Sequence, residues 1–81
     1  MHVSLAIDAV EKEFLRACVK HPTGFHSSHE GYAVIKEEVD ELWDEIKEQH
    51  SSPACLRTEA IHVAAMALRF LVDVCENPPE E

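Results

Sequence analysis

Residues 30–48 constrain the fold most, because they combine a helical apolar pattern with a high density of carboxylates. The apolar residues recur at spacings of three and four, so they share one face of a predicted helix with Trp43 at its edge: Tyr32, Ile35, Val39, Leu42 and Ile46. Glu38, Glu41 and Glu45 follow one flank of that face. A carboxylate directed towards a core is costly unless a cation, a proton or a basic side chain compensates it. We therefore expect Glu38 and Glu41 to be partly buried and compensated. A solvated face is expected for four other acidic residues of this stretch: Glu37, Asp40, Asp44 and Glu48.

The pattern predicts two more helices on either side of this one. The first covers residues 4–20, with Ser4 as its cap, and its buried stripe is predicted to contain Val3, Ile7, Val10, Phe14, Ala17 and Cys18. Nothing on this helix suggests chemistry, so we assign it to packing. The central helix starts at Ser27 or Ser28, because Ser27-x-x-Glu30 is a capping box, and ends near residue 49 or 50.

The third helix is predicted from Pro53, with Ser52 as its cap, to residue 75 or 76, and Asn77 is expected to close it in the left-handed conformation. The short connection before it makes the second and third helices antiparallel neighbours. Two nearly opposite sides of the third helix are apolar: Leu56, Ala60, Val63, Ala67, Phe70 and Val74 on one, and Ile61, Ala64, Ala65, Leu68 and Val72 on the other. A polar stripe lies between them: Glu59, His62, Arg69 and Asp73, with Met66 among them.

A helix that is apolar on two sides is usually central, and three helices cannot easily cover both sides. We therefore predict that the second side packs against another copy of the chain, in a homodimer or a dimer of dimers. The compatible alternative is that the first helix covers part of this side. The expected fold is all-α: three antiparallel helices, in one domain over residues 1–81, that complete a helical bundle by homo-oligomerisation.

Composition narrows the partners and the compartment. The formal charge of −9 argues against a nucleic acid polymer or an anionic membrane as partner. It suits a protein that binds divalent cations, or one that only needs to stay soluble. The longest apolar run, residues 61–74, is too short and too polar to span a membrane. Three cysteines without a Cys-x-x-Cys pair, and a start without signal-peptide features, predict reduced thiols in a cytoplasmic protein.

Four residues form a candidate metal site. Glu38-x-x-Glu41 and Glu59-x-x-His62 are both one-turn pairs, so the two side chains of each pair point the same way. In antiparallel helices the two pairs lie at similar levels and can face each other. Three inward carboxylates would repel one another, and Mg²⁺ relieves that repulsion while keeping positions open for water and phosphate oxygens. Such an ion can neutralise phosphate charge and activate water.

At these residues the chain resembles the all-α nucleoside triphosphate pyrophosphohydrolases of the MazG-like group, in particular small phage-type members. That family carries Glu-x-x-Glu on one helix and Glu-x-x-Asp on the next. The resemblance covers roughly residues 29–74 and rests on two segments in order: HEGYAVIKEEVDELWDEIK and RTEAIHVAAMALRFL.

The resemblance implies hydrolysis of a nucleoside triphosphate between the α and β phosphates, with Mg²⁺, or Mn²⁺ as the alternative. It implies that Glu38, Glu41 and Glu59 are metal ligands, and that the protein forms dimers or dimers of dimers. His62 departs from the family pattern, which has aspartate at this position. Imidazole suits Mn²⁺ better than Mg²⁺, so the departure points either to a different metal or to a missing metal site with weak or lost activity. We therefore count His62 with these three as a candidate metal-binding and catalytic residue, whether as a ligand, as a base or as a phosphate contact.

Other roles remain open at this stage. Arg69 could meet phosphate charge, with a solvent-exposed or glutamate-paired arginine as the alternative, and Asp73 and His29 are further candidate substrate contacts. His26 and His29 allow a weaker interpretation, a divalent-metal binder that also uses these two histidines. The main alternative to an enzyme is a catalytically silent helical dimer that acts as an interaction or regulatory module, which His62 and the short chain favour.

Overall fold

The computed structural model describes residues 2–78, and every regular element in that range is helical. The helices are α1 (Val3–Lys20), α2 (Ser28–Lys47) and α3 (Pro53–Phe70), and α3 continues into a π-helical segment, η1 (Leu71–Glu76). The predicted all-α fold is confirmed. Within residues 2–78, no helix is long and apolar enough to cross a membrane. The three cysteines are free thiols.

Side-chain caps fix where the helices begin. Ser27 accepts a hydrogen bond from the Glu30 amide, and Ser52 accepts one from the Cys55 amide, as the sequence predicts. Three predictions at the ends are wrong. Helix α2 ends at Lys47, before the predicted end near residue 49 or 50. The cap of α1 is His2, whose imidazole accepts from the Ser4 amide at 3.2 Å, so α1 starts one residue earlier. Asn77 has φ −130°, outside the left-handed region, and instead donates its side-chain amide to the Val72 carbonyl.

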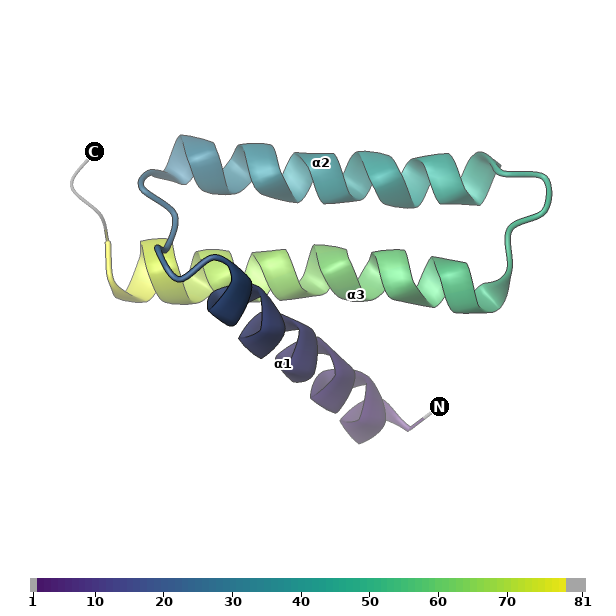
Figure 1. Cartoon of the computed structure of the whole chain (residues 1–81), viewed down its shortest axis with the longest axis horizontal. Helices are drawn as coiled ribbons and strands as arrows, with labels where there is room; N and C mark the ends of the chain where they lie inside the picture. The colour runs from purple at the N-terminus through teal and green to yellow at the C-terminus, as the bar shows by residue number, and fades with distance from the viewer. Residues whose placement is uncertain (1, 79–81) are drawn as a thin grey trace.

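The helices α2 and α3 lie antiparallel and side by side, and α1 crosses α3 obliquely (Figure 1). The N-terminal end of α1 projects away from the α2–α3 pair in this view. Helices α2 and α3 approach closely at Gly31, where a Cβ atom would lie 2.5 Å from the Phe70 ring. A larger residue at this position would push the two helices apart.

The core of a single chain is small. Within the described residues, its buried apolar side chains are Ala17, Phe25, Ala65 and Met66, and none of them is both large and fully buried. Val34, Ile35, Phe70 and three further apolar residues pack against this cluster without being buried themselves. The side chains of α1, α2 and α3 thus meet mainly where α1 ends and the α1–α2 loop begins.

The inward face of α2 is rotated from the predicted one. After Ser28 in its first turn, the residues of α2 least exposed to solvent form a line that includes two carboxylates: Gly31, Val34, Ile35, Glu38, Leu42 and Glu45. Much of the predicted apolar face is instead open to solvent, since Tyr32, Val39 and Ile46 are exposed, together with Trp43. The polar stripe of α3 is likewise inward, with Met66 and Arg69 buried. The α2–α3 interface therefore contains charged side chains, while several large apolar side chains of α2 lie on its outer side.

The predicted stripe of α1 is only half covered in this chain. Val10, Phe14 and Ala17 pack in or against the core, whereas Val3 and Ile7 are exposed. The C-terminal half of α1 lies against α3 and so covers part of its second apolar side, which matches the compatible alternative above.

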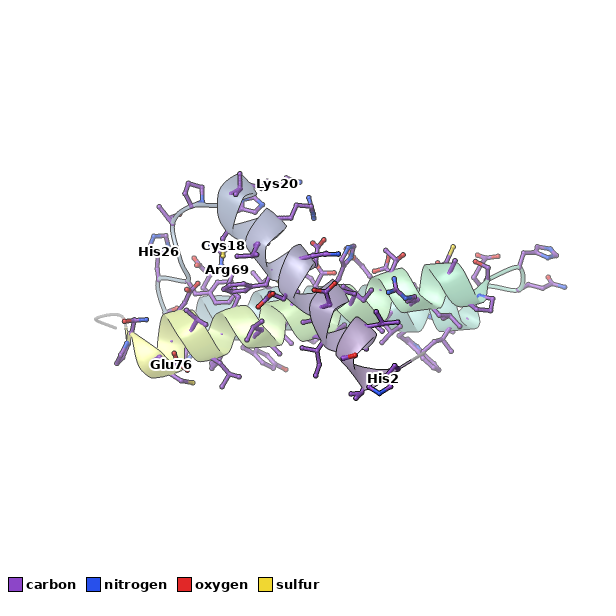
Figure 2. The ribbon with its side chains drawn as sticks, turned by 90° about the horizontal axis from the view of Figure 1, so that it is seen from below. His2, Cys18, Lys20, His26, Arg69 and Glu76 are labelled. Atoms are coloured by element: carbon purple, nitrogen blue, oxygen red, sulfur yellow. The ribbon has the colours of Figure 1, made fainter. Side chains whose placement is uncertain are left out.

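Arg69 fastens α1 to α3, and Figure 2 shows it beneath the C-terminal end of α1, close to Cys18. Its guanidinium donates to the carbonyls of Ala17, His21 and Thr23, and its Nε donates to Asp73 at 3.0 Å. Asp73 also accepts a hydrogen bond from the backbone amide of Phe25. The buried charge of Arg69 is therefore compensated by carbonyls at the C-terminal end of α1 and in the α1–α2 loop, and by one carboxylate.

Replacing Arg69 by methionine should lower the free energy of unfolding by about 3–5 kcal/mol, because Asp73 and three inward carbonyls lose their partner. Arg57 on the exposed side of α3 is the matched control, and Arg57→Met should change stability by less than about 0.5 kcal/mol. Urea denaturation of the two variants measures the difference. Equal stability of both variants would show that Arg69 does not hold α1 in place.

Candidate metal centre

The four residues predicted from the two one-turn pairs lie together between α2 and α3. Glu38, Glu41, Glu59 and His62 each offer one ligand atom, and these atoms lie within 4.8 Å of one another. Glu38 and Glu41 come from the middle of α2, and Glu59 and His62 from the facing turns of α3. The side chains of Glu38 and Glu59 are 23% exposed and that of His62 is 29% exposed, whereas Glu41 lies at the open side.

Two carboxylate oxygens in this cluster are buried without compensation. Oε2 of Glu38 and Oε2 of Glu59 accept no hydrogen bond from the described residues. His62 Nδ1 lies 3.7 Å from each of them, too far for a hydrogen bond. Glu45, on the same line of α2, contrasts with them because its Oε1 accepts from the Ser51 hydroxyl at 3.0 Å. The uncompensated oxygens are therefore confined to the level where the two pairs meet.

The electrostatics of Glu38 reflect this position. Burial raises the pKa of the Glu38 carboxyl, and the charge of Glu41 and a hydrogen bond with it raise that pKa further. The nearby His62 acts in the opposite direction, and Glu59 adds to the increase. The cluster is thus unfavourable for negative charge when it holds no cation.

A fifth residue, Glu13 of α1, lies beside the same cluster, although we expected α1 to serve packing alone. Glu13 Oε2 lies 3.9 Å from His62 Nε2, and the Glu13 side chain is 16% exposed. Arg16 holds this carboxylate with two hydrogen bonds of 2.8 Å and 2.6 Å. The hydrogen bond from Arg16 lowers the pKa of Glu13, so this carboxylate stays ionised. The sequence offers one indication of this placement: Glu13 lies four residues before Ala17, on the side of α1 that was predicted to be buried.

A cavity of about 480 Å³ opens beside the cluster. It extends from Glu38 and His62, past the apolar side chains of Val34 and Met66, to the α1–α2 loop at Phe25. Arg16 and Lys20 contribute cationic side chains to its wall. Its volume lies in the range of small-molecule sites. The same cavity is lined by basic side chains and, at one end, by the carboxylate cluster.

The three candidate substrate residues lie apart from the cluster. Arg69 lines the loop end of the cavity, but its donors are used by backbone carbonyls and Asp73. The sequence also allowed a solvent-exposed or a glutamate-paired Arg69. Both of these alternatives are wrong, because Arg69 is buried and its carboxylate partner is an aspartate. His29 is exposed and is not among the residues that line this cavity. Their predicted contact with substrate stays a prediction.

His26 of the α1–α2 loop and His29 in the first turn of α2 do not join the metal cluster in the described part of the chain. His26 lies 3.3 Å from Glu30 Oε2, and its backbone amide donates to the other oxygen of Glu30 at 3.0 Å. In a capping box, the Glu30 side chain would accept from the backbone amide of the cap residue, Ser27. Here it accepts from the amide of the preceding residue, His26, and stabilises the start of α2 in that way.

We compared the chain with protein-family models, curated proteins and solved structures. No family model matches the chain, and neither the curated proteins nor the solved structures contain a significant match.

Replacing Glu38 by glutamine should stabilise the metal-free protein by about 1 kcal/mol at pH 7, because an ionised carboxylate no longer has to be buried. A carboxyl with a raised pKa in the folded state favours folding at low pH and loses that contribution as the pH rises through its folded pKa. The gain from Glu38→Gln should therefore be smaller at pH 5 than at pH 7.

Urea denaturation in the presence of a chelator measures this gain, with Asp44→Asn on the exposed side of α2 as the matched control. A Glu38→Gln variant that is less stable than Asp44→Asn at pH 7 would mean that the Glu38 charge is already compensated within the protein.

Proposed function

We propose that this chain is a metal-dependent nucleoside triphosphate pyrophosphohydrolase of the MazG-like type, which converts a nucleoside triphosphate and water to a nucleoside monophosphate and pyrophosphate. The observation that carries the proposal is the pair of buried, uncompensated oxygens of Glu38 and Glu59, which face each other across α2 and α3 with His62 between them. A merely structural helix pair would place apolar side chains or matched charges there.

The donor set fits a divalent cation. Ligands on opposite sides of Mg²⁺ stand about 4.2 Å apart, since each lies about 2.1 Å from the ion, and the spread of 4.8 Å among the four ligand atoms is close to this. Three carboxylates suit Mg²⁺ or Mn²⁺, and one imidazole shifts the preference towards Mn²⁺. When bound, the ion would neutralise phosphate charge and activate water for attack on phosphorus.

The surrounding residues suit the remaining tasks of such an enzyme. Lys20 on the cavity wall supplies positive charge for a triphosphate that ends at the carboxylates, whereas Arg16 on the same wall is already paired with Glu13. The apolar side chains of Val34, Met66 and Phe25 offer a surface for the base or sugar. No residue among them selects one base edge over another, so the proposal extends to the nucleoside triphosphates as a class.

The proposal includes assembly of the chain into a homodimer or a dimer of dimers in the cytoplasm. The accessible surface is 5778 Å², against about 4,900 Å² for a compact monomer of this length. The excess of roughly 900 Å² is comparable to the roughly 800 Å² that each partner buries in a standard interface. The exposed apolar residues of α2 and of the N-terminal half of α1 supply a suitable surface.

Purified protein should release pyrophosphate from at least one nucleoside triphosphate in the presence of Mg²⁺ or Mn²⁺. Glu38→Gln should lower this rate at least about 100-fold, since metal activation is worth several kcal/mol in such reactions. Asp44→Asn should retain the activity, because Asp44 lies on the exposed side of the same helix. The absence of turnover with every nucleotide and both metals would contradict the enzyme and favour the silent helical dimer.

Replacing His62 by aspartate should change which metal supports the reaction. A fourth carboxylate in place of an imidazole favours a hard cation, so the ratio of the Mg²⁺-supported rate to the Mn²⁺-supported rate should rise on the order of tenfold. Steady-state rates at saturating metal measure this ratio. An unchanged ratio would remove His62 from the set of ligands.

A further inference from the structure

A second cavity, of about 610 Å³, lies between α3 and the N-terminal half of α1, where α1 crosses α3 obliquely (Figure 1). It shares three lining residues with the cavity described above: Glu13, Arg16 and His62. The residues that the two cavities take from α1 recur at helical spacings from Leu5 to Lys20, so they follow one flank of this helix. The two cavities therefore form one groove along α1, and His62 of the carboxylate cluster lies where they meet.

The second cavity contains an arginine without a partner. Arg57 of α3 lies five residues before His62, is exposed and lines this cavity. Its guanidinium takes part in no hydrogen bond or ion pair with the part of the chain that the structure describes. The other two arginines differ, because Arg16 donates to Glu13 and Arg69 donates to loop carbonyls and an aspartate. The donors of Arg57 are therefore available to a ligand in the groove.

A second cation on the same wall is only weakly engaged. Lys12 lines the second cavity and lies 3.0 Å from Asp8, and both side chains are more than half exposed. An exposed pair of this kind contributes little to stability, so an anionic ligand of higher charge can compete with Asp8 for Lys12. The groove thus offers basic side chains on the side of the carboxylate cluster that faces away from the α1–α2 loop.

We propose that the second cavity is a pyrophosphate subsite, in which Arg57 binds the two terminal phosphates of the nucleotide while the nucleoside occupies the first cavity. The inference rests on the proposed function and assigns one side of the cluster to each product. Hydrolysis between the α and β phosphates releases the β and γ phosphates together, and negative charge develops on this leaving group. A planar guanidinium can donate two parallel hydrogen bonds to phosphate oxygens, which makes Arg57 suited to this end of the substrate.

Calorimetric titration of the full chain with inorganic pyrophosphate, in the presence of Mg²⁺, tests the subsite. Wild-type protein should bind pyrophosphate, and Arg57→Met should weaken this binding about tenfold, because charge-assisted hydrogen bonds to phosphate are lost. Lys36→Met is the matched control: it removes the same charge from an exposed position of α2 that lines neither cavity. It should change the affinity less than about twofold, since an exposed charge at a distance is screened by salt. Circular dichroism confirms that the variants compared are folded.

Two results would overturn the inference: wild-type protein that does not bind pyrophosphate at millimolar concentration, and an Arg57→Met protein that matches Lys36→Met in affinity. Neither readout uses nucleotide hydrolysis. Pyrophosphate binding that depends on Arg57, in a protein that turns over no nucleotide, would refute the hydrolase and retain the anion site. Turnover together with pyrophosphate binding that is indifferent to Arg57 would refute the subsite alone.

Discussion

The compensation of inward-facing charge between α2 and α3 is the constraint on which the rest of this structure depends. The charges in the polar stripe of α3 are compensated at one end of the stripe and not at the other. At the C-terminal end, buried Arg69 and Asp73 pair with each other and with backbone groups of the α1–α2 loop. Towards the N-terminal end, Glu59 lies close to Glu38 of α2, and His62 is the basic side chain among residues 2–78 that forms an ion pair with either of them. The buried charges at the C-terminal end are thus fully paired, whereas the carboxylates at the other end would be compensated by a cation or by protons.

The same arrangement accounts for the unusual exterior. Because α2 turns Glu38 and Glu45 towards α3, its larger apolar side chains, including Trp43 and Val39, face solvent. A chain with so few buried apolar residues gains little hydrophobic stabilisation on its own. Association through the apolar exterior and cation binding in the interior would stabilise the protein from opposite sides of the same helix, which is why the proposed function includes both.

Local patterns predicted much of the fold. The caps at Ser27 and Ser52, the three helices and the antiparallel α2–α3 pair follow from capping chemistry, periodicity and a short connection. The closeness of Glu38, Glu41, Glu59 and His62 followed from their spacing and their distance from the turn. The rotation of α2 did not, because periodicity identifies an apolar face without indicating whether it meets this chain or another surface.

The contribution of α1 to the site could not be predicted either. The approach of Glu13 to His62 depends on the oblique crossing of α1 over α3, which is set by tertiary contacts such as those of Arg69 with the Ala17 and His21 carbonyls. No local pattern in residues 3–20 encodes that crossing, so a surface-type Glu13–Arg16 pair and a site residue look alike in the sequence. The structural position of Arg69 was obscured for the same reason.

The central claim is that the carboxylates of α2 and α3 surround a divalent cation. A crystal structure of the protein grown with Mn²⁺, with anomalous diffraction data to locate the ion, tests it most directly. The account predicts an anomalous peak within about 2.3 Å of oxygens from both Glu38 and Glu59. A peak elsewhere, or none between these two side chains at millimolar Mn²⁺, would contradict it.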